Sequence, residues 1–177
     1  MQRQGFYATG LNQLLTESGA PKGSLYFHFP GGKEQIAAEA VADAGERFRT
    51  GIERAIGGAG SPSEVVRVLV RAMADGLERS GYVEGCPLAT VALETSVTSE
   101  ALRSACRAAF RSWEDAIAAR LEQFGWEQDA ASSFAVVLLA ALEGGLLLAR
   151  TERDVSPLLT VGEQLARLAE QGDGVSG

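Results

Sequence analysis

The sequence has few of the residues that build metal sites, disulfide frameworks and catalytic centres. Among its 177 residues are two cysteines and one histidine, His28. Cys86 and Cys106 are twenty residues apart and belong to no CxxC pair, so neither a disulfide framework nor a zinc site is indicated. We also find no set of nucleophile, base and orienting group, and no phosphate-binding loop. The sequence therefore predicts a protein that is not an enzyme, needs no cofactor or metal, and suits a reducing cytoplasm.

Basic charge is scarce as well. The formal net charge of −7 argues against a protein that coats nucleic acid or anionic membrane with its whole surface. Residues 1–36 nevertheless carry three Lys/Arg against two acids, which leaves 13 against 21 in the remainder. The acid is concentrated downstream, so a local patch that binds nucleic acid is compatible with the N-terminal end.

The sequence lacks a secretory signal, since no basic region is followed by an apolar stretch and a small-residue cleavage site. One segment, residues 130–149, is long enough to span a membrane and has Glu143 as its only charge. An acid well inside a membrane span costs about 2.5–3.5 kcal/mol. We therefore expect a buried helix of a soluble protein that does not associate with membranes, because all-round apolar helices also occur in cores and dimer interfaces.

Strand patterns are nearly absent, and apolar residues recur at spacings of three and four, so the fold class is predicted to be all-α. A well-marked helix start occurs at Ser61-Pro62-Ser63-Glu64, a capping box with Pro62 at the first helical position. Long helices are expected over approximately residues 33–56, 62–80, 99–124, 128–153 and 157–171, and a short one over residues 88–95.

The N-terminal segment has the pattern of a helix-turn-helix. Thr9 is placed to cap a short helix over residues 10–18, and Gly19 supplies the turn. On the next helix Leu25 and Phe29 lie four residues apart and pack back on the leucines of the first helix. The opposite side of that second helix then faces outward.

The outward residues of the second helix suit contact with DNA: Lys22, Gly23, Ser24, Tyr26, Phe27 and His28. Lys22 can reach a phosphate or a guanine edge, and Gly23 lets the backbone approach the groove. The Phe27 ring can contact the methyl group of a thymine. His28 suits a packed or capping role equally well, and the whole segment could instead be a surface turn with stacked rings. Farther on, Gly31, Gly32 and Lys33 offer free N–H groups and a cation for a phosphate.

The stretch GFYATGLNQLLTESGAPKGSLYFHFPGGKEQIAAEAV, residues 5–41, resembles the DNA-binding domain of the TetR/AcrR transcriptional regulators. Less specifically, GYVEGCPLATVALE and ALEGGLLLAR are similar to the ligand-binding region of the branch with the lincomycin- and quercetin-responsive repressors. The resemblance implies that DNA contacts come from Thr9, Lys22, Ser24, Tyr26, His28 and Lys33. It also places Gly10 where a Thr or Ser often contacts phosphate.

Two departures from the family pattern concern the front of the chain. PGGK is one residue longer than the commoner form, and only residues 1–4 stand where family members have a full amphipathic first helix. We therefore divide the chain into a DNA-binding domain over residues 1–45, with an incomplete first helix, and a helical effector-binding and dimerisation domain over residues 46–177. A small-molecule-binding helical dimer without DNA-binding activity is the alternative.

Large side chains on the helix stripes are core residues by default, but they can also line a cavity for an apolar ligand between helices. On the second interpretation the effector pocket is formed by Met73, Leu77, Cys86, Leu88, Phe110, Trp113, Ile117, Phe134 and Leu138. Cys86 is expected to be a packed or pocket-lining thiol, because no cation lies beside it in the sequence.

Small residues and a leucine face near the C-terminus permit close helix approach. They serve either an intrachain contact or, as the resemblance favours, a two-fold four-helix dimer interface. The interface residues would be Ala140, Ala141, Gly144, Gly145, Leu148, Leu158 and Leu165. A homodimer of this kind matches double-stranded DNA with a palindromic operator. The predicted function is that of a ligand-responsive repressor of the TetR type, modulated by a small apolar molecule.

Overall fold

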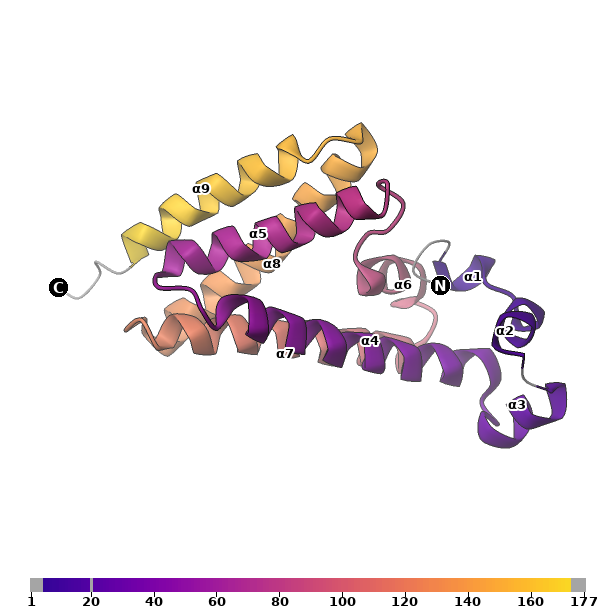
Figure 1. Ribbon diagram of the computed structural model, residues 1–177. Helices are drawn as coiled ribbons and strands as arrows, with labels where there is room; N and C mark the ends of the chain where they lie inside the picture. Colours follow the sequence, from indigo (N-terminus) through magenta and orange to yellow (C-terminus); the bar gives the residue numbers. More distant parts are fainter. Residues whose placement is uncertain (1–4, 20, 173–177) are drawn as a thin grey trace.

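The computed structural model describes residues 5–19 and 21–172, and over these residues all of the regular structure is helical, as predicted (Figure 1). The helices are α1 (Gly5–Ala8), α2 (Leu11–Ser18), α3 (Lys22–His28), α4 (Gly32–Ile56), α5 (Pro62–Arg79), α6 (Pro87–Thr95), α7 (Glu100–Glu122), α8 (Gln128–Glu152) and α9 (Ser156–Gly172).

Helices α1, α2 and α3 gather around the N-terminal end of α4, at one end of the molecule (Figure 1). Gly19 ends α2 with φ of 66°, in the left-handed region that favours glycine. On α3 Leu25 is buried, and Phe29 just beyond its end is half-buried. The predicted helix-turn-helix is confirmed in the α2–Gly19–α3 unit, because its apolar side faces inward.

The long helices form the rest of the molecule. Helix α4 runs along α7, α5 packs on α9, and α8 packs on both α7 and α9. Their facing sides share one core, in which Val65, Leu102 and Leu138 are fully buried. The α4 helix has no break at residue 45, so a single rigid element passes from the N-terminal unit into the body.

The capping box at the start of α5 is confirmed. The Ser61 hydroxyl accepts a hydrogen bond from the Glu64 backbone N–H at 3.2 Å, and the Glu64 carboxylate accepts one from the Gly60 N–H at 2.7 Å. The return bond thus reaches Gly60, one residue before the cap.

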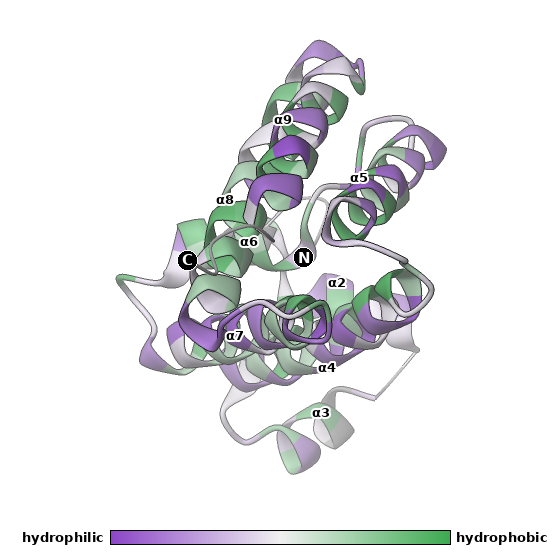
Figure 2. Cartoon of the chain, turned by 90° about the vertical axis from the view of Figure 1, so that its left-hand side faces the viewer, coloured by the Kyte–Doolittle hydropathy of each residue, from purple (hydrophilic) through white to green (hydrophobic). Residues whose placement is uncertain are grey.

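Helix α8 is long and apolar enough to cross a membrane, by length and composition alone. In Figure 2 the visible part of α8 is largely hydrophobic, whereas α5 and α9 mix hydrophobic with hydrophilic residues. One side of α8, with Ala135, Leu138 and Leu142, is buried against its neighbours within the chain. The opposite side exposes Val137 and Leu148.

Candidate functional site

The outer face of α3 carries an exposed aromatic group. The exposed fractions of Tyr26 and Phe27 are 51% and 82%, and His28 is exposed beside them. The Phe27 and His28 rings meet edge to face with centroids 5.1 Å apart. Exposed apolar rings on a short helix are unusual unless they meet a partner.

Gly23 also lies on this open surface, since a Cβ added to it would meet no heavy atom within 4 Å. The backbones of Lys22 and Ser24 are part of α3, while their side chains lie outside the described part of the chain. Their predicted contacts with DNA remain predictions.

Thr9 is placed differently from the prediction. Its side chain is 2% exposed, and its hydroxyl donates to the Gly5 carbonyl at 2.7 Å, so it braces α1 and does not face solvent. The N-cap of α2 is Gly10, which is exposed and makes no side-chain capping bond. The sequence could not show this, because Thr9 suits a helix cap and a bond to the residue four positions earlier equally well.

The phosphate seat predicted at the start of α4 also needs correction. The Gly31 N–H donates to the Gln35 side chain at 2.9 Å, and the Gly32 N–H donates to the Phe29 carbonyl at 2.8 Å, so neither group is free. The Lys33 ammonium lies 4.3 Å from the Phe6 ring centroid and 3.4 Å from the Tyr7 carbonyl. In this structure Lys33 joins α4 to α1 through these two contacts.

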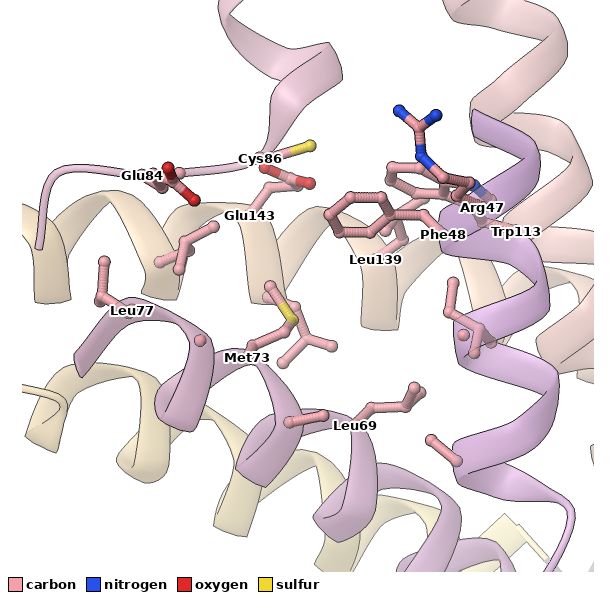
Figure 3. Close-up of a pocket in the computed structure, with 18 of the residues that line it drawn as sticks. Arg47, Phe48, Leu69, Met73, Leu77, Glu84, Cys86, Trp113, Leu139 and Glu143 are labelled. Atoms are coloured by element: carbon pink, nitrogen blue, oxygen red, sulfur yellow. The ribbon is translucent and has the colours of Figure 1, made fainter. Parts of the chain in front are cut away.

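A cavity of about 460 Å³ lies between α4, α5, α7 and α8 (Figure 3). Five of the predicted pocket residues line it: Met73, Leu77, Cys86, Trp113 and Ile117. Its volume falls in the range of small-molecule sites, and most of its lining is apolar. A pocket between these helices is therefore present in the body of the molecule.

Four predicted pocket residues lie elsewhere. Leu88 and Leu138 are fully buried core residues that do not line the cavity. Phe110 lines a smaller neighbouring hollow, and Phe134 packs against Trp126 with ring centroids 5.1 Å apart. Helix periodicity shows only which side of a helix is apolar, and several buried residues on that side pack against neighbours instead of lining the cavity.

The sequence prediction missed the residues of α4 and α8 that line the cavity, including its acidic group Glu143. Phe48 and Ile52 of α4 line it, and their spacing of four residues puts them on one side of that helix. Leu139, Leu142, Glu143 and Leu146 of α8 also line it. Glu143 is the only charge in residues 130–149, and this isolated acid is the sequence signal that points to it.

Glu143 and Cys86 meet at the end of the cavity where α6 begins (Figure 3). The Cys86 thiol lies beside the Glu143 carboxylate in Figure 3, and the two groups act on each other's pKa. Burial, with the Glu143 charge beside it, raises the pKa of the Cys86 thiol, so the group is a neutral donor. Burial likewise raises the pKa of Glu143 above its ordinary value, and the Cys86 thiol opposes that rise.

Two elements connect the cavity to the N-terminal unit. The first is α4, which begins next to α3 and lines the cavity with Phe48 and Ile52. The second is α6, whose Glu94 carboxylate accepts hydrogen bonds from the Phe6 and Tyr7 N–H groups at 2.7 and 3.0 Å. Because Cys86 is the N-cap of this same α6, one short helix connects the Cys86–Glu143 pair to α1.

The outer face of α8 exposes four apolar side chains: Val136, Val137, Leu147 and Leu148. On α9 Leu159 and Leu168 are exposed too, but nine residues separate them, so they lie on opposite sides of that helix. Of the predicted interface residues, Ala140, Gly144 and Leu148 lie on the exposed face, and Ala141 is half-buried. Gly145, Leu158 and Leu165 are buried within the chain, where an added Gly145 Cβ would lie 3.2 Å from the Leu158 side chain. For these three the intrachain alternative applies, because all are buried within the chain and the small Gly145 lets α8 and α9 approach closely.

Among the described residues, no group of three or more His, Cys, Asp or Glu is placed to hold a metal ion.

Two family models match the chain. Residues 1–40 match the model of bacterial regulatory proteins of the tetR family, and residues 62–164 match the C-terminal domain model of LmrA/YxaF-like transcriptional regulators. Over 170 residues the chain is 39% identical to the HTH-type transcriptional regulator LmrA of Bacillus subtilis, covering 96% of this chain and 90% of the relative. It is 37% identical to the uncharacterized regulator YxaF of the same organism, covering 96% and 89%.

Solved structures share the fold. A TetR transcriptional regulator from Legionella pneumophila superposes with a TM-score of 0.81 at 20% identity, over 95% of this chain and 90% of the other. The reduced form of E. coli NemR superposes with a TM-score of 0.82 at 23% identity, over 93% and 88%.

Proposed function

This chain belongs to the TetR family of bacterial transcriptional regulators, and we propose that it acts as a dimeric, ligand-responsive repressor of a palindromic operator. Regulators of this family bind DNA, and the exposed face of α3 supports the assignment of that contact to Tyr26, Phe27 and His28. We assign no catalytic activity and a cytoplasmic location.

The proposal that a ligand controls DNA binding depends on one observation, the continuity of α4. A single unbroken helix begins beside α3 and lines the 460 Å³ cavity with Phe48 and Ile52. A small apolar molecule that binds more tightly to one arrangement of Phe48 and Ile52 would favour the α4 position that goes with it. Because α4 begins beside α3, the distance between the two α3 helices of a dimer would then change. The α6 connection through Glu94 supplies a second path from the cavity to α1.

The dimer is proposed on the exposed apolar face of α8, with α9 beside it. Val137 and Leu148 are about half exposed and lie on the same side of α8, and apolar residues gathered on one surface favour a protein partner. Gly144 has no heavy atom within 4 Å of an added Cβ, so a second helix has room to approach. A two-fold contact here would give the molecule the symmetry of a palindrome.

Fluorescence anisotropy of labelled DNA from the region upstream of the gene tests DNA binding. A salt series measures the electrostatic contribution to the binding free energy. Specific binding with a steep negative slope of log affinity on log salt is expected. Absence of specific binding at low salt would favour the alternative, a ligand-binding helical dimer without DNA activity.

Phe27→Ala is the matched variant for this measurement. The side chain is 82% exposed, so its removal should lower operator affinity without lowering stability. Val97→Ala removes another exposed apolar side chain, in the segment after α6, and should leave operator affinity unchanged.

A further inference from the structure

The charges that line the cavity are not distributed evenly. Arg47 and Arg79 line it but are exposed, and Arg47 is paired with Asp43. The two acids that line it, Glu84 and Glu143, are half-buried. The less exposed side of the cavity is therefore the acidic one.

Glu143 is the carboxylate that a ligand would meet at the end of the apolar cavity where α6 begins (Figure 3). Leu139, Leu142 and Leu146 of the same helix stand around it, and Figure 3 shows its carboxylate beside the Cys86 thiol. A carboxylate has about four acceptor positions, whereas a thiol supplies one weak donor. The hydrogen-bonding capacity of Glu143 thus exceeds what Cys86 provides.

No basic side chain of the described residues is among the groups that act on the Glu143 pKa, which are burial and Cys86. The nearest cation along α8 is Arg150, two helical turns away, where its guanidinium lies beside Gly85. An acid in apolar surroundings is costly unless it is paired, and acids of this kind gather at functional sites.

We propose that the cavity binds a ligand with an apolar body and a protonated amine, and that the amine binds the Glu143 carboxylate beside Cys86. The apolar body lies against Trp113, Ile117 and Met73, and the ammonium group supplies up to three strong donors to Glu143. The proposal deepens the proposed function, on which it rests, by giving the effector a chemical class. It also connects the effector to α6, since Cys86 begins that helix.

Three matched probes test the proposal: biphenyl-4-ylmethylamine, biphenyl-4-ylmethanol and biphenyl-4-carboxylate, which share one apolar body and differ in charge. Trp113 lines the cavity and reports binding by its fluorescence once Trp126→Phe has removed the other tryptophan. The amine is expected to bind at least tenfold more tightly than the alcohol, and the carboxylate more weakly than either.

Glu143→Gln keeps the size of the side chain and removes its charge, so it should abolish the preference for the amine while leaving alcohol binding within about twofold. Glu152→Gln makes the same substitution at an exposed position of α8 and should leave the preference intact. Circular dichroism confirms that each variant is folded.

Equal binding of amine and alcohol, an unchanged preference in Glu143→Gln, or no binding of any probe overturns the proposal. Operator binding is measured separately, with and without the amine. If the amine binds through Glu143 and leaves operator affinity unchanged, the proposed ligand class is supported and the proposed control of operator binding by the ligand is refuted. If the alcohol changes operator affinity as strongly as the amine does, control of operator binding by a ligand is supported and the proposed preference for an amine is refuted.

Discussion

The Trp113 indole N–H of α7 donates a hydrogen bond to the Gly45 carbonyl of α4 over 2.8 Å. Gly45 sits so close to α7 that an added Cβ would lie 2.6 Å from the Ala109 Cβ. One turn farther along α4, Phe48 stacks on Trp113 with ring centroids 5.4 Å apart. Trp113, which fixes α4 against α7, is therefore also part of the cavity wall. We expect a ligand beside Trp113 to change the position of α4.

Gly45→Ala should destabilise the protein, because Ala109 offers only a short, rigid methyl group that cannot move aside. Overpacking of this kind costs about 1–3 kcal/mol, against a gain in helix propensity of about 1 kcal/mol. Gly51→Ala on the same helix meets no heavy atom within 4 Å and should be neutral or stabilising. Urea unfolding of both variants checks the difference, and equal stability of the two would contradict tight packing at Gly45.

Glu94→Ala should loosen α1 from the body. Its carboxylate accepts the N–H groups of Phe6 and Tyr7, and loss of a comparable capping side chain costs about 0.5–2 kcal/mol. We expect faster hydrogen exchange at these two amides and weaker operator binding. Leu93→Ala, at a neighbouring position that is 87% exposed, is the control and should change neither. Unaltered exchange at Phe6 and Tyr7 in Glu94→Ala would rule out this contact in solution.

Glu143→Gln should stabilise the protein more at neutral pH than at acid pH. Because burial raises the Glu143 pKa in the folded state, the folded chain holds this proton more tightly than the unfolded chain. The wild type therefore loses stability as the pH rises from about 4.5 through the folded pKa, and the glutamine variant does not. Urea unfolding between pH 4.5 and 8, with Glu152→Gln as the control, measures the difference. A gain that is independent of pH would show that Glu143 does not titrate as inferred.

Leu148→Arg should convert the proposed dimer to monomer, because it places a charge on the exposed apolar face of α8 where a partner helix would have to bury it. The fold of one chain should be unaffected, since the side chain is about half exposed. Val97→Arg, at a residue that is 98% exposed after α6, should leave the oligomeric state unchanged. Analytical ultracentrifugation distinguishes the two, and a Leu148→Arg dimer as stable as that of the wild type would place the interface elsewhere.

The sequence by itself determined the features that depend on neighbours along the chain. Apolar spacings of three and four specified the helices, Gly19 specified the turn, and Ser61 with Glu64 specified the start of α5. The outward face of α3 followed from the same periodicity, because Leu25 and Tyr26 must point to different sides of one short helix.

Only the tertiary structure decided which residues share a cavity, a core or an open surface. Met73 lines the cavity and Leu88 does not, although both belong to apolar stripes, because lining depends on where neighbouring helices leave space. Lys33 contacts α1, and Leu158 packs under Gly145, since these contacts join residues far apart in the chain. Periodicity orients a side chain relative to its own helix axis, whereas its partner is set by how the helices cross.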